Sequence, residues 1–322
     1  MLDNRSMRRE SFVFRGARVD YWRSAERHEN AVVLLHGLGA DHRGLLDMAA
    51  TLTGVTVIAP DLPGFGSSDP MPGPHTLDNF ATVVEELRRH LGLARFTLLG
   101  HSLGGTIALA YAGRYGSALD ALCLLNPMFV ADGPTARLGK FYYDLSTWLP
   151  SPLGRLLLTS RPVIYLSDRA IFTTADAALR RRVLRLDYDT ARMTTPKAIR
   201  ESYQSLRDTP IDQYAEGVLV PTLLLTGALD RLATPRVLTL LHRLVRSSRL
   251  EIVETGGHLL PVEEPEMVAG LVDAFLAESR AAADVRQAPD TRQTPGGDDA
   301  DRLRPTSPAL PGMTRQSGPG QR

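Results

Sequence analysis

The residues best suited to chemistry lie at 100–104, where the chain reads Gly-His-Ser-Leu-Gly, a G-x-S-x-G pattern. An apolar, strand-like run at 95–99 precedes this pattern, and a helix-like run at 105–115 follows it. The glycines on both sides of the serine leave room for the strand and the helix to approach each other. A serine on such a strained turn is exposed at the carboxyl end of a sheet. The pattern therefore predicts that Ser102 is a catalytic nucleophile.

A serine hydroxyl is a weak nucleophile near neutral pH and needs a base within hydrogen-bonding distance. His258 follows the last expected strand in a glycine-flanked loop, from which its imidazole can reach the sheet edge, so we predict that it is the base. His101 adjoins the serine, but neighbours on a tight turn point in different directions, so we expect it to be structural, and we expect His36 to tie its own loop together. The remaining histidines fall in polar or helical settings and are expected to be solvated: His28, His42, His75, His90 and His242.

The base in turn needs an acid that fixes its tautomer and stabilises the imidazolium. Asp230 follows an expected strand at 222–226 by a short glycine-led loop, so it emerges at the same sheet edge as the serine and the histidine. The order Ser, Asp, His is that of enzymes whose nucleophile stands on a strand-to-helix elbow. Asp120 lies at the wrong end of its strand, and Asn126, at the right end, is not an acid. We therefore predict Asp230 as the acid, the alternative being an ordinary loop carboxylate.

Acyl transfer also needs hydrogen-bond donors aimed at the developing oxyanion. The backbone N–H of Leu103, directly after the serine, is one candidate. A second loop reads His-Gly-Leu-Gly at 36–39, and its small residues let the backbone turn an amide toward the serine. We expect the N–H of Leu38 to be the second oxyanion donor.

Short apolar runs that alternate with helix-like segments must position these residues. The expected strands are 11–14, 18–22, 31–35, 56–59, 96–99 and 121–125, and the expected helices between them are 43–52, 77–91 and 106–115. The last four strands are almost continuously apolar, as is typical of parallel strands covered on both faces. The first two are more polar and are expected to form an antiparallel edge. This alternation predicts an α/β fold with a doubly wound, mostly parallel sheet.

The alternation stops near residue 128 and resumes near 215. The intervening segment is helix-rich and punctuated by prolines. The pattern then continues as strand, helix, strand and helix at 222–226, 237–245, 250–253 and 265–278. We therefore expect a first core half at 1–127, a helical cap at 128–214 inserted after the sixth strand, a second core half at 215–280, and a disordered tail rich in Pro, Asp and Arg at 281–322.

Composition excludes several classes of protein. A net charge of +1 over 322 residues gives no reason to expect nucleic acid as a partner. The single cysteine, Cys123, excludes an intramolecular disulfide and a cysteine-rich metal site, and is expected to be a buried strand residue. No apolar run is long enough to span a membrane, and no apolar signal segment follows the polar N-terminus. We therefore expect no integral membrane span and a cytoplasmic location. The sequence contains no feature that indicates the oligomeric state.

Five motifs, in this order along the chain, resemble those of the α/β-hydrolase superfamily, in particular its lid-bearing serine esterases and lipases. They are His36-Gly37-Leu38-Gly39, Asp61-Leu62-Pro63-Gly64-Phe65-Gly66-Ser67-Ser68, Gly100-His101-Ser102-Leu103-Gly104-Gly105, Gly227-Ala228-Leu229-Asp230 and Gly256-Gly257-His258. The resemblance covers roughly residues 11–278. It implies a helical cap, no cofactor and no metal ion, and it gives Asp61 a structural role in a turn.

Together these features predict a serine hydrolase that cleaves a small-molecule carboxylic ester with an apolar acyl or alcohol part through an acyl-enzyme. A serine at the elbow argues against superfamily members with an aspartate nucleophile, such as epoxide hydrolases. Hydrolysis of a thioester, a lactone or a C–C bond stays open, and so does a non-catalytic, ligand-binding role.

Two groups of cap residues have alternative interpretations. The aromatic and leucine side chains at 141–143, 148–149 and 156–158 either line an apolar pocket or pack the cap onto the core. The arginines at 180, 181, 182 and 185 form either a solvated helix face or, less favoured, a carboxylate-binding site.

Overall fold

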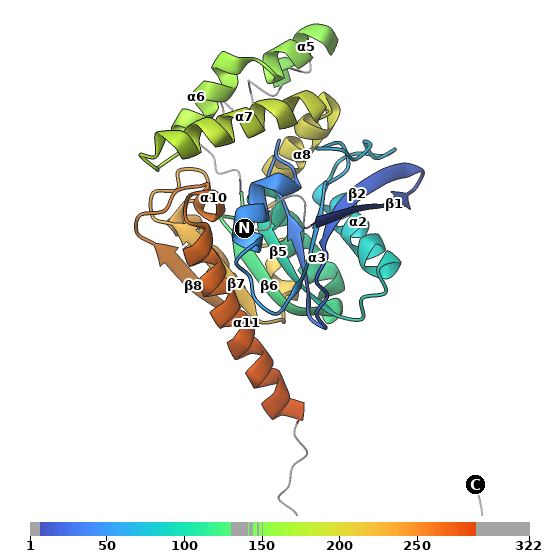
Figure 1. Cartoon of the computed structure of the whole chain (residues 1–322), viewed down its shortest axis with the longest axis vertical. Coiled ribbons are helices and arrows are strands. Elements are labelled where there is room, and N and C mark those ends of the chain that lie inside the picture. Colours follow the sequence, from blue (N-terminus) through green and yellow to red (C-terminus); the bar gives the residue numbers. More distant parts are fainter. Residues whose placement is uncertain (1–6, 130–140, 142–143, 147, 150, 288–322) are drawn as a thin grey trace, which may run out of the picture.

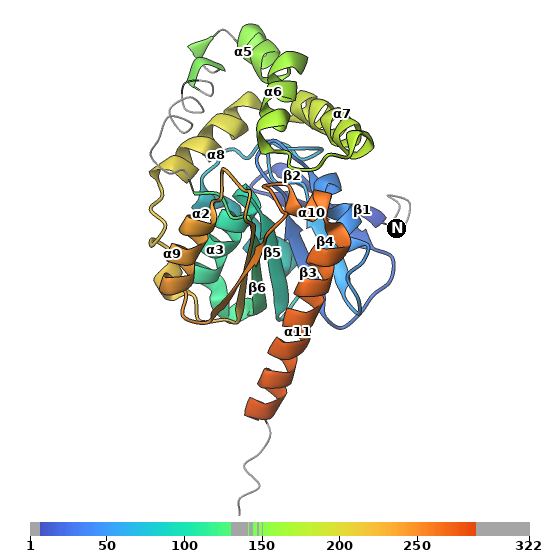
Figure 2. The ribbon, with the colours of Figure 1, turned by 90° about the vertical axis from the view of Figure 1, so that its left-hand side faces the viewer.

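The structure is a computed structural model that describes residues 7–129, 141, 144–146, 148–149 and 151–287. Among these residues, eight strands form one sheet in the order β1-β2-β4-β3-β5-β6-β7-β8. The strands are β1 (Met7–Phe14), β2 (Ala17–Ser24), β3 (Ala31–Leu35), β4 (Thr56–Pro60), β5 (Phe96–His101), β6 (Leu119–Leu125), β7 (Thr222–Gly227) and β8 (Ser248–Val253). Helices cover both faces of the sheet, and a helical cap lies over one end of it (Figures 1 and 2).

The helices fall into a core group and a cap group. The core helices are α1 (Leu46–Ala49), α2 (Leu77–His90), α3 (Leu103–Tyr115), α9 (Pro235–Leu244), α10 (Leu260–Glu263) and α11 (Pro265–Gln287). The cap helices are α5 (Ser151–Leu158), α6 (Arg161–Ile171), α7 (Ala177–Met193) and α8 (Pro196–Asp208). The cap therefore enters the chain between β6 and β7, after the sixth strand, as expected.

The sheet is antiparallel at one edge and parallel elsewhere. β1 pairs antiparallel with β2, and β2 pairs antiparallel with β4, whereas β3 to β8 pair in parallel. The polar runs of the first two strands and the apolar runs of the others predicted this division, because only strands buried on both faces need continuous apolar sequence. The α/β class and the doubly wound, mostly parallel sheet are confirmed.

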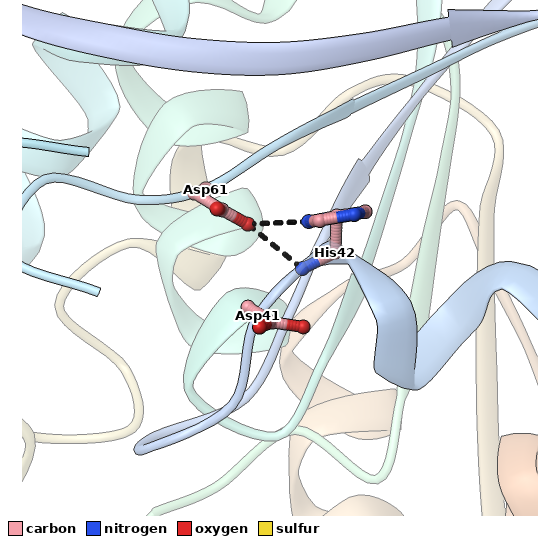
Figure 3. Close-up of side chains that lie close together, drawn as sticks. All are labelled: Asp41, His42 and Asp61. Atoms are coloured by element: carbon pink, nitrogen blue, oxygen red, sulfur yellow. Dashed lines mark hydrogen bonds and ion pairs between the residues drawn. The ribbon is translucent and has the colours of Figure 1, made fainter. Parts of the chain in front are cut away.

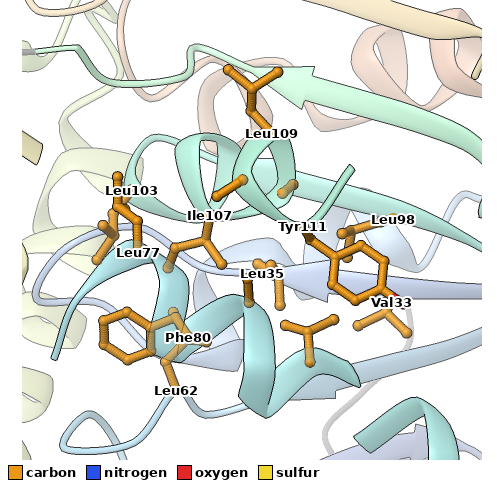
Figure 4. Close-up of a cluster of buried hydrophobic side chains, with 14 of the residues drawn as sticks. Val33, Leu35, Leu62, Leu77, Phe80, Leu98, Leu103, Ile107, Leu109 and Tyr111 are labelled. Carbon is orange, nitrogen blue, oxygen red and sulfur yellow. The ribbon is translucent and has the colours of Figure 1, made fainter. Parts of the chain in front are cut away.

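Side-chain alternation along the strands divides the interior into two layers. Val33, Leu35 and Leu98 face α2 and α3 in one layer, part of which is drawn in Figure 4. Their neighbours Val32 and Leu34 face the opposite layer, which α1 and α11 cover. Successive residues of a strand point to opposite faces, so each central strand supplies both layers. Cys123 is buried in the second layer, as expected for a small strand residue.

Two expected boundaries are wrong. Helix α11 runs to Gln287, so residues 281–287 continue the last helix rather than beginning the tail, and the end of this helix projects away from the sheet in Figure 1. The rest of the expected tail, 288–322, lies outside the described residues. The expected helix at 43–52 is a 3₁₀ turn, His42–Leu45, followed by the short α1. Of the helices that are described, none combines the length and apolar character needed to cross a bilayer.

Candidate active site

Ser102 stands on a strained turn between β5 and α3. Its backbone has φ of +54° and ψ of −118°, in the left-handed half of conformational space that residues with a side chain rarely adopt. A Cβ atom on Gly100 would lie 2.1 Å from the carbonyl oxygen of Gly104, and one on Gly104 would lie 2.2 Å from that of Leu35. Both positions therefore need glycine, because the strand and helix backbones meet there without space for a side chain.

The structure brings Ser102, Asp230 and His258 together at the carboxyl edge of the sheet. The three residues follow β5, β7 and β8. Ser102 Oγ lies 3.0 Å from His258 Nε2, and His258 Nδ1 lies 2.9 Å from Asp230 Oδ2. Each of the three residues is only 4% exposed, so the expectation of an exposed serine is wrong, and the hydrogen bonds act in a largely water-free environment.

The Asp230 carboxylate accepts four hydrogen bonds. Its Oδ1 accepts the backbone N–H groups of Leu232 and Ala233 at 2.7 and 2.9 Å, and its Oδ2 accepts from His258 Nδ1 and Asn126 Nδ2. Burial alone raises the pKa of this carboxyl, but the hydrogen bonds from His258 and Asn126 outweigh burial and hold the pKa below its usual value. Asp230 is therefore ionised at neutral pH, and its Oδ2 accepts the Nδ1–H of His258, which orients the imidazole.

Asn126 belongs to this cluster, and the sequence interpretation passed over it as a non-acid. It follows β6, with φ of +46°, and is fully buried. Its Nδ2 lies 2.7 Å from Asp230 Oδ2 and 3.1 Å from the carbonyl oxygen of Gly257, in the loop that carries His258. The signal available in the sequence was an amide at the carboxyl end of a buried apolar strand, the end at which functional residues of parallel sheets gather.

Two histidines near the site have structural contacts. His101 Nε2 donates to the backbone oxygen of His258 at 2.9 Å, and burial lowers the pKa of this imidazole to about 4. His36 Nδ1 donates to Gly37, while its Nε2 accepts the N–H of Leu62, so this ring joins two loops. Both contacts agree with the structural roles expected for these residues.

The expectation of solvated histidines is wrong for His42 and His75, which are 5% and 0% exposed. His75 Nδ1 lies 2.8 Å from Glu201 Oε2 on cap helix α8. His42 stacks on Trp22 with ring centroids 3.4 Å apart. Their polar sequence settings did not reveal these partners, because each partner comes from a distant part of the chain.

Asp41, His42 and Asp61 form a buried trio whose donor atoms lie within 4.8 Å of one another, the spacing of a possible metal site (Figure 3). Arg43 binds both oxygens of Asp41, with its nearest guanidinium nitrogen 2.7 Å from Oδ2. Asp61 Oδ1 accepts the N–H and the Nδ1–H of His42, and Asp61 Oδ2 accepts the N–H of Ser67. Every carboxylate oxygen of the trio is thus engaged within the protein, which agrees with the structural role expected for Asp61.

The two residues expected to supply oxyanion donors belong to segments next to Ser102. A Cβ atom on Gly37 would lie 3.2 Å from Ser102 Cβ, so the loop that carries Leu38 runs next to the serine. Leu103 is the first residue of α3, and the N–H of a first helical residue has no partner within its own helix. Met128, which sequence reasoning did not identify, places its Sδ 3.8 Å from Ser102 Oγ and forms a wall of the site.

The cap side chains expected either to line a pocket or to pack onto the core divide into two groups. Phe141, Trp148 and Leu156 are 63%, 82% and 65% exposed, so they do not pack onto the core, whereas Leu158 is buried. Tyr142 and Tyr143 lie outside the described residues.

Comparison with known proteins agrees with this geometry. Residues 30–265 match the family described as alpha/beta hydrolase fold. An uncharacterized protein of Mycobacterium tuberculosis is 27% identical over 272 residues, covering 78% of this chain and 76% of its own length. Lipase 1 of Psychrobacter immobilis is 24% identical over 254 residues, covering 76% of each chain. The solved structure of a membrane phospholipase A, a bacterial virulence factor, has a TM-score of 0.70 at 26% identity and covers 85% of this chain and 87% of that one.

Proposed function

Because the chain belongs to the alpha/beta hydrolase family, we propose that it is a serine hydrolase that cleaves a carboxylic ester with an apolar acyl or alcohol part. The observation that carries this proposal is the pair of hydrogen bonds, 3.0 and 2.9 Å long, that joins Ser102 through His258 to Asp230. The similarity to a lipase and to a phospholipase A supports an ester substrate with an apolar part.

In the first step, Ser102 Oγ attacks the ester carbonyl carbon while His258 Nε2 takes the hydroxyl proton. Asp230 stays ionised and stabilises the imidazolium that forms. The N–H groups of Leu38 and Leu103 donate to the oxyanion of the tetrahedral intermediate. The C–O bond to the alcohol then breaks, and His258 gives its proton to the departing oxygen. This leaves the acyl group on Ser102.

In the second step, water replaces the alcohol. His258 takes a proton from the water as its oxygen attacks the acyl carbon, and the same two N–H groups bind the second oxyanion. Collapse of this intermediate returns the proton to Ser102 and releases the carboxylic acid. The protein's own side chains supply every proton transfer in this scheme.

The proposal is tested with p-nitrophenyl esters from acetyl to palmitoyl, beside matched thioester and lactone substrates. We expect hydrolysis that peaks at one chain length, and a fall in kcat of about 10⁴-fold or more in Ser102→Ala. Ser117→Ala, which changes an exposed serine beyond the far end of α3, is the matched control and should keep wild-type kcat. A fluorophosphonate probe should label the wild type and not Ser102→Ala.

Other outcomes of this test favour other functions. Probe labelling without turnover of any ester favours C–C bond hydrolysis by the same serine. Absence of both labelling and turnover favours a ligand-binding protein. Ester hydrolysis that survives Ser102→Ala contradicts the proposed mechanism.

A further inference from the structure

A groove of about 740 Å³ lies in the cap between α6 and α7, which run side by side in Figures 1 and 2. Its apolar lining comes from Pro162, Ile164, Tyr165 and Leu184, and Ile164 is buried. The groove shares no lining residue with the Ser102, Asp230 and His258 cluster. Its size lies within the range of about 300–1,000 Å³ that small-molecule sites occupy.

The described rim of this groove carries more positive than negative charge. Arg161, Arg185 and Arg192 line it, and among the described residues none of the three forms an ion pair. Among the described residues, Asp189 is the one carboxylate that lines the groove, and its charge interacts with Arg43, outside the groove. The described lining of the groove therefore has three guanidinium groups against one carboxylate.

Cation–π contacts with one tyrosine ring position two of these guanidinium groups. Those of Arg161 and Arg192 lie over the ring of Tyr188, at 4.5 and 5.7 Å from its centroid. A guanidinium stacked on a ring keeps its in-plane N–H donors available, and those donors match carboxylate and phosphate oxygens. Because Arg161 lies on α6 and Arg192 on α7, the stacking places donors from both helices at one groove.

We propose that this groove binds an anionic amphiphile, that is, a carboxylate or phosphate headgroup on an alkyl chain. The headgroup binds to Arg161, Arg185 and Arg192, and the chain packs along Ile164 and Leu184. An inorganic anion would leave the apolar lining uncovered, and an uncharged chain would leave the positive charge of the rim without a counter-charge. The site is separate from Ser102, so the inference goes beyond the proposed hydrolase activity.

Arg182, on the same helix, differs from Arg185. Its guanidinium pairs with the carboxylate of Asp47 on α1 and ties the cap to the core. The arginine-rich run of α7 is therefore neither wholly a solvated face nor wholly an anion site. Arg182 contacts the core and Arg185 lines the groove, so two arginines three residues apart on α7 have different surroundings.

The test uses isothermal titration of the full chain carrying Ser102→Ala, so that hydrolysis plays no part and the outcome does not depend on the proposed activity. Dodecanoate and dodecyl phosphate, each below its critical micelle concentration, are the probes. We expect one binding site per chain, with an affinity that falls as salt is added. Adding Arg185→Gln and Arg192→Gln together should weaken binding by about tenfold or more, because each change removes a charged hydrogen bond. Arg181→Gln, on the exposed face of α7 outside the groove, should bind as the parent does.

Four results would overturn the proposal. The first is unchanged dodecanoate binding in the double arginine variant, which would locate the ligand elsewhere. The second is equal affinity for inorganic phosphate and dodecyl phosphate, which would indicate a simple anion site. The third is equal affinity for dodecyltrimethylammonium, which would indicate adsorption of the chain alone. The fourth is capture of the protein by anionic phospholipid vesicles without binding of either monomeric probe, which would indicate a membrane surface instead.

Discussion

At the scale of single residues, the Asp230 carboxylate accepts a hydrogen bond from Asn126, a neighbour that is not itself ionisable. Asn126 donates to the same carboxylate oxygen that accepts from His258 Nδ1, and it also holds the carbonyl of Gly257. One amide group therefore connects the acid with the loop of the base. We infer that Asn126 is a positioning residue, since it acts on the proposed nucleophile only through Asp230 and His258.

We predict that Asn126→Gly lowers kcat for an ester substrate by about tenfold or more and leaves KM nearly unchanged. Glycine accepts the φ of +46° at this position, so the change removes the amide without adding backbone strain. Loss of one hydrogen bond to a charged group costs about 1.5–3 kcal/mol, and here the loss falls on the orientation of His258. Steady-state kinetics over a range of pH measure the effect.

Thr222→Val is the control for Asn126→Gly. It removes a buried hydroxyl that bonds to Val220, at the opposite end of β7 from Asp230. It should lower the free energy of unfolding while kcat stays at the wild-type value. A wild-type kcat in Asn126→Gly, at every pH, would rule out the positioning role.

At the scale of elements, the β5–α3 elbow depends on backbone contact that a single methyl group would break. We predict that Gly104→Ala destabilises the fold by about 1–3 kcal/mol, the usual cost of overpacking, and lowers kcat as well. The reason is that a Cβ atom at this position meets backbone oxygens of Leu35 and His36, at 2.2 and 2.7 Å, which cannot rotate away. Chemical denaturation and ester kinetics measure the two effects.

Gly116→Ala is the matched control, just after the carboxyl end of the same helix. A Cβ atom there has no neighbour within 4 Å among the described residues, and the backbone φ is −55°. The change should leave kcat unaltered and raise stability slightly, because alanine restricts the unfolded chain. Equal stability losses in the two variants would contradict the elbow argument.

The cap is tied to the core beside the proposed base. Glu263, in α10, accepts the N–H groups of Thr173 and Thr174 at 2.8 and 2.9 Å and the hydroxyl of Thr173 at 2.5 Å. Thr173 also lies against Gly257, the residue before His258. The connection between α6 and α7 is thus bound to the loop that carries the base.

We predict that Glu263→Ala raises the hydrogen-exchange rate of the Thr173 and Thr174 amides by about tenfold or more, because both N–H groups lose an ionised acceptor. Exchange measured by mass spectrometry on peptides that cover α6 and α7 tests this. The adjacent, exposed Glu264 forms no hydrogen bond through its side chain with any described residue, so Glu264→Ala is the control and should exchange as the wild type does. Unchanged exchange in Glu263→Ala would show that the cap is held by other contacts.

At the scale of the whole molecule, buried neutral imidazoles couple stability to pH. Burial lowers the pKa of His36, His75 and His101, in the last case to about 4, against about 6.5 in an unfolded chain. The unfolded chain therefore binds more protons than the folded chain between these values. The stability that these groups contribute is complete above pH 6.5 and is lost as pH falls toward 4.

We predict that the free energy of unfolding falls between pH 7 and pH 4, with His101 alone accounting for about 3 kcal/mol. Urea denaturation at a series of pH values measures this. His101→Gln keeps a donor for the backbone oxygen of His258 but does not titrate, so its stability should depend less steeply on pH. His28→Gln, at an exposed position, should follow the wild-type curve. A wild-type pH dependence in His101→Gln would contradict the assignment.

The sequence by itself determined the sheet, its antiparallel edge, the insertion after the sixth strand and the edge at which Ser102, Asp230 and His258 emerge. These features are local, because a strand is recognised from a few consecutive apolar residues and a tight turn from its glycines. The carboxyl ends of parallel strands meet at one edge, so the order of elements was enough to gather the three residues. Element ends were less well determined, as α11 illustrates by continuing past residue 280.

Only the tertiary structure decided which polar groups are partners. Asn126 meets Asp230 across 104 positions, His75 meets Glu201 across 126, and Thr173 meets Glu263 across 90. It also separated Arg182, paired with the core, from Arg185, which faces a groove. The physical reason is that such pairings depend on how helices and strands pack in three dimensions. Consecutive residues along the chain indicate only whether a segment is apolar, polar or bent.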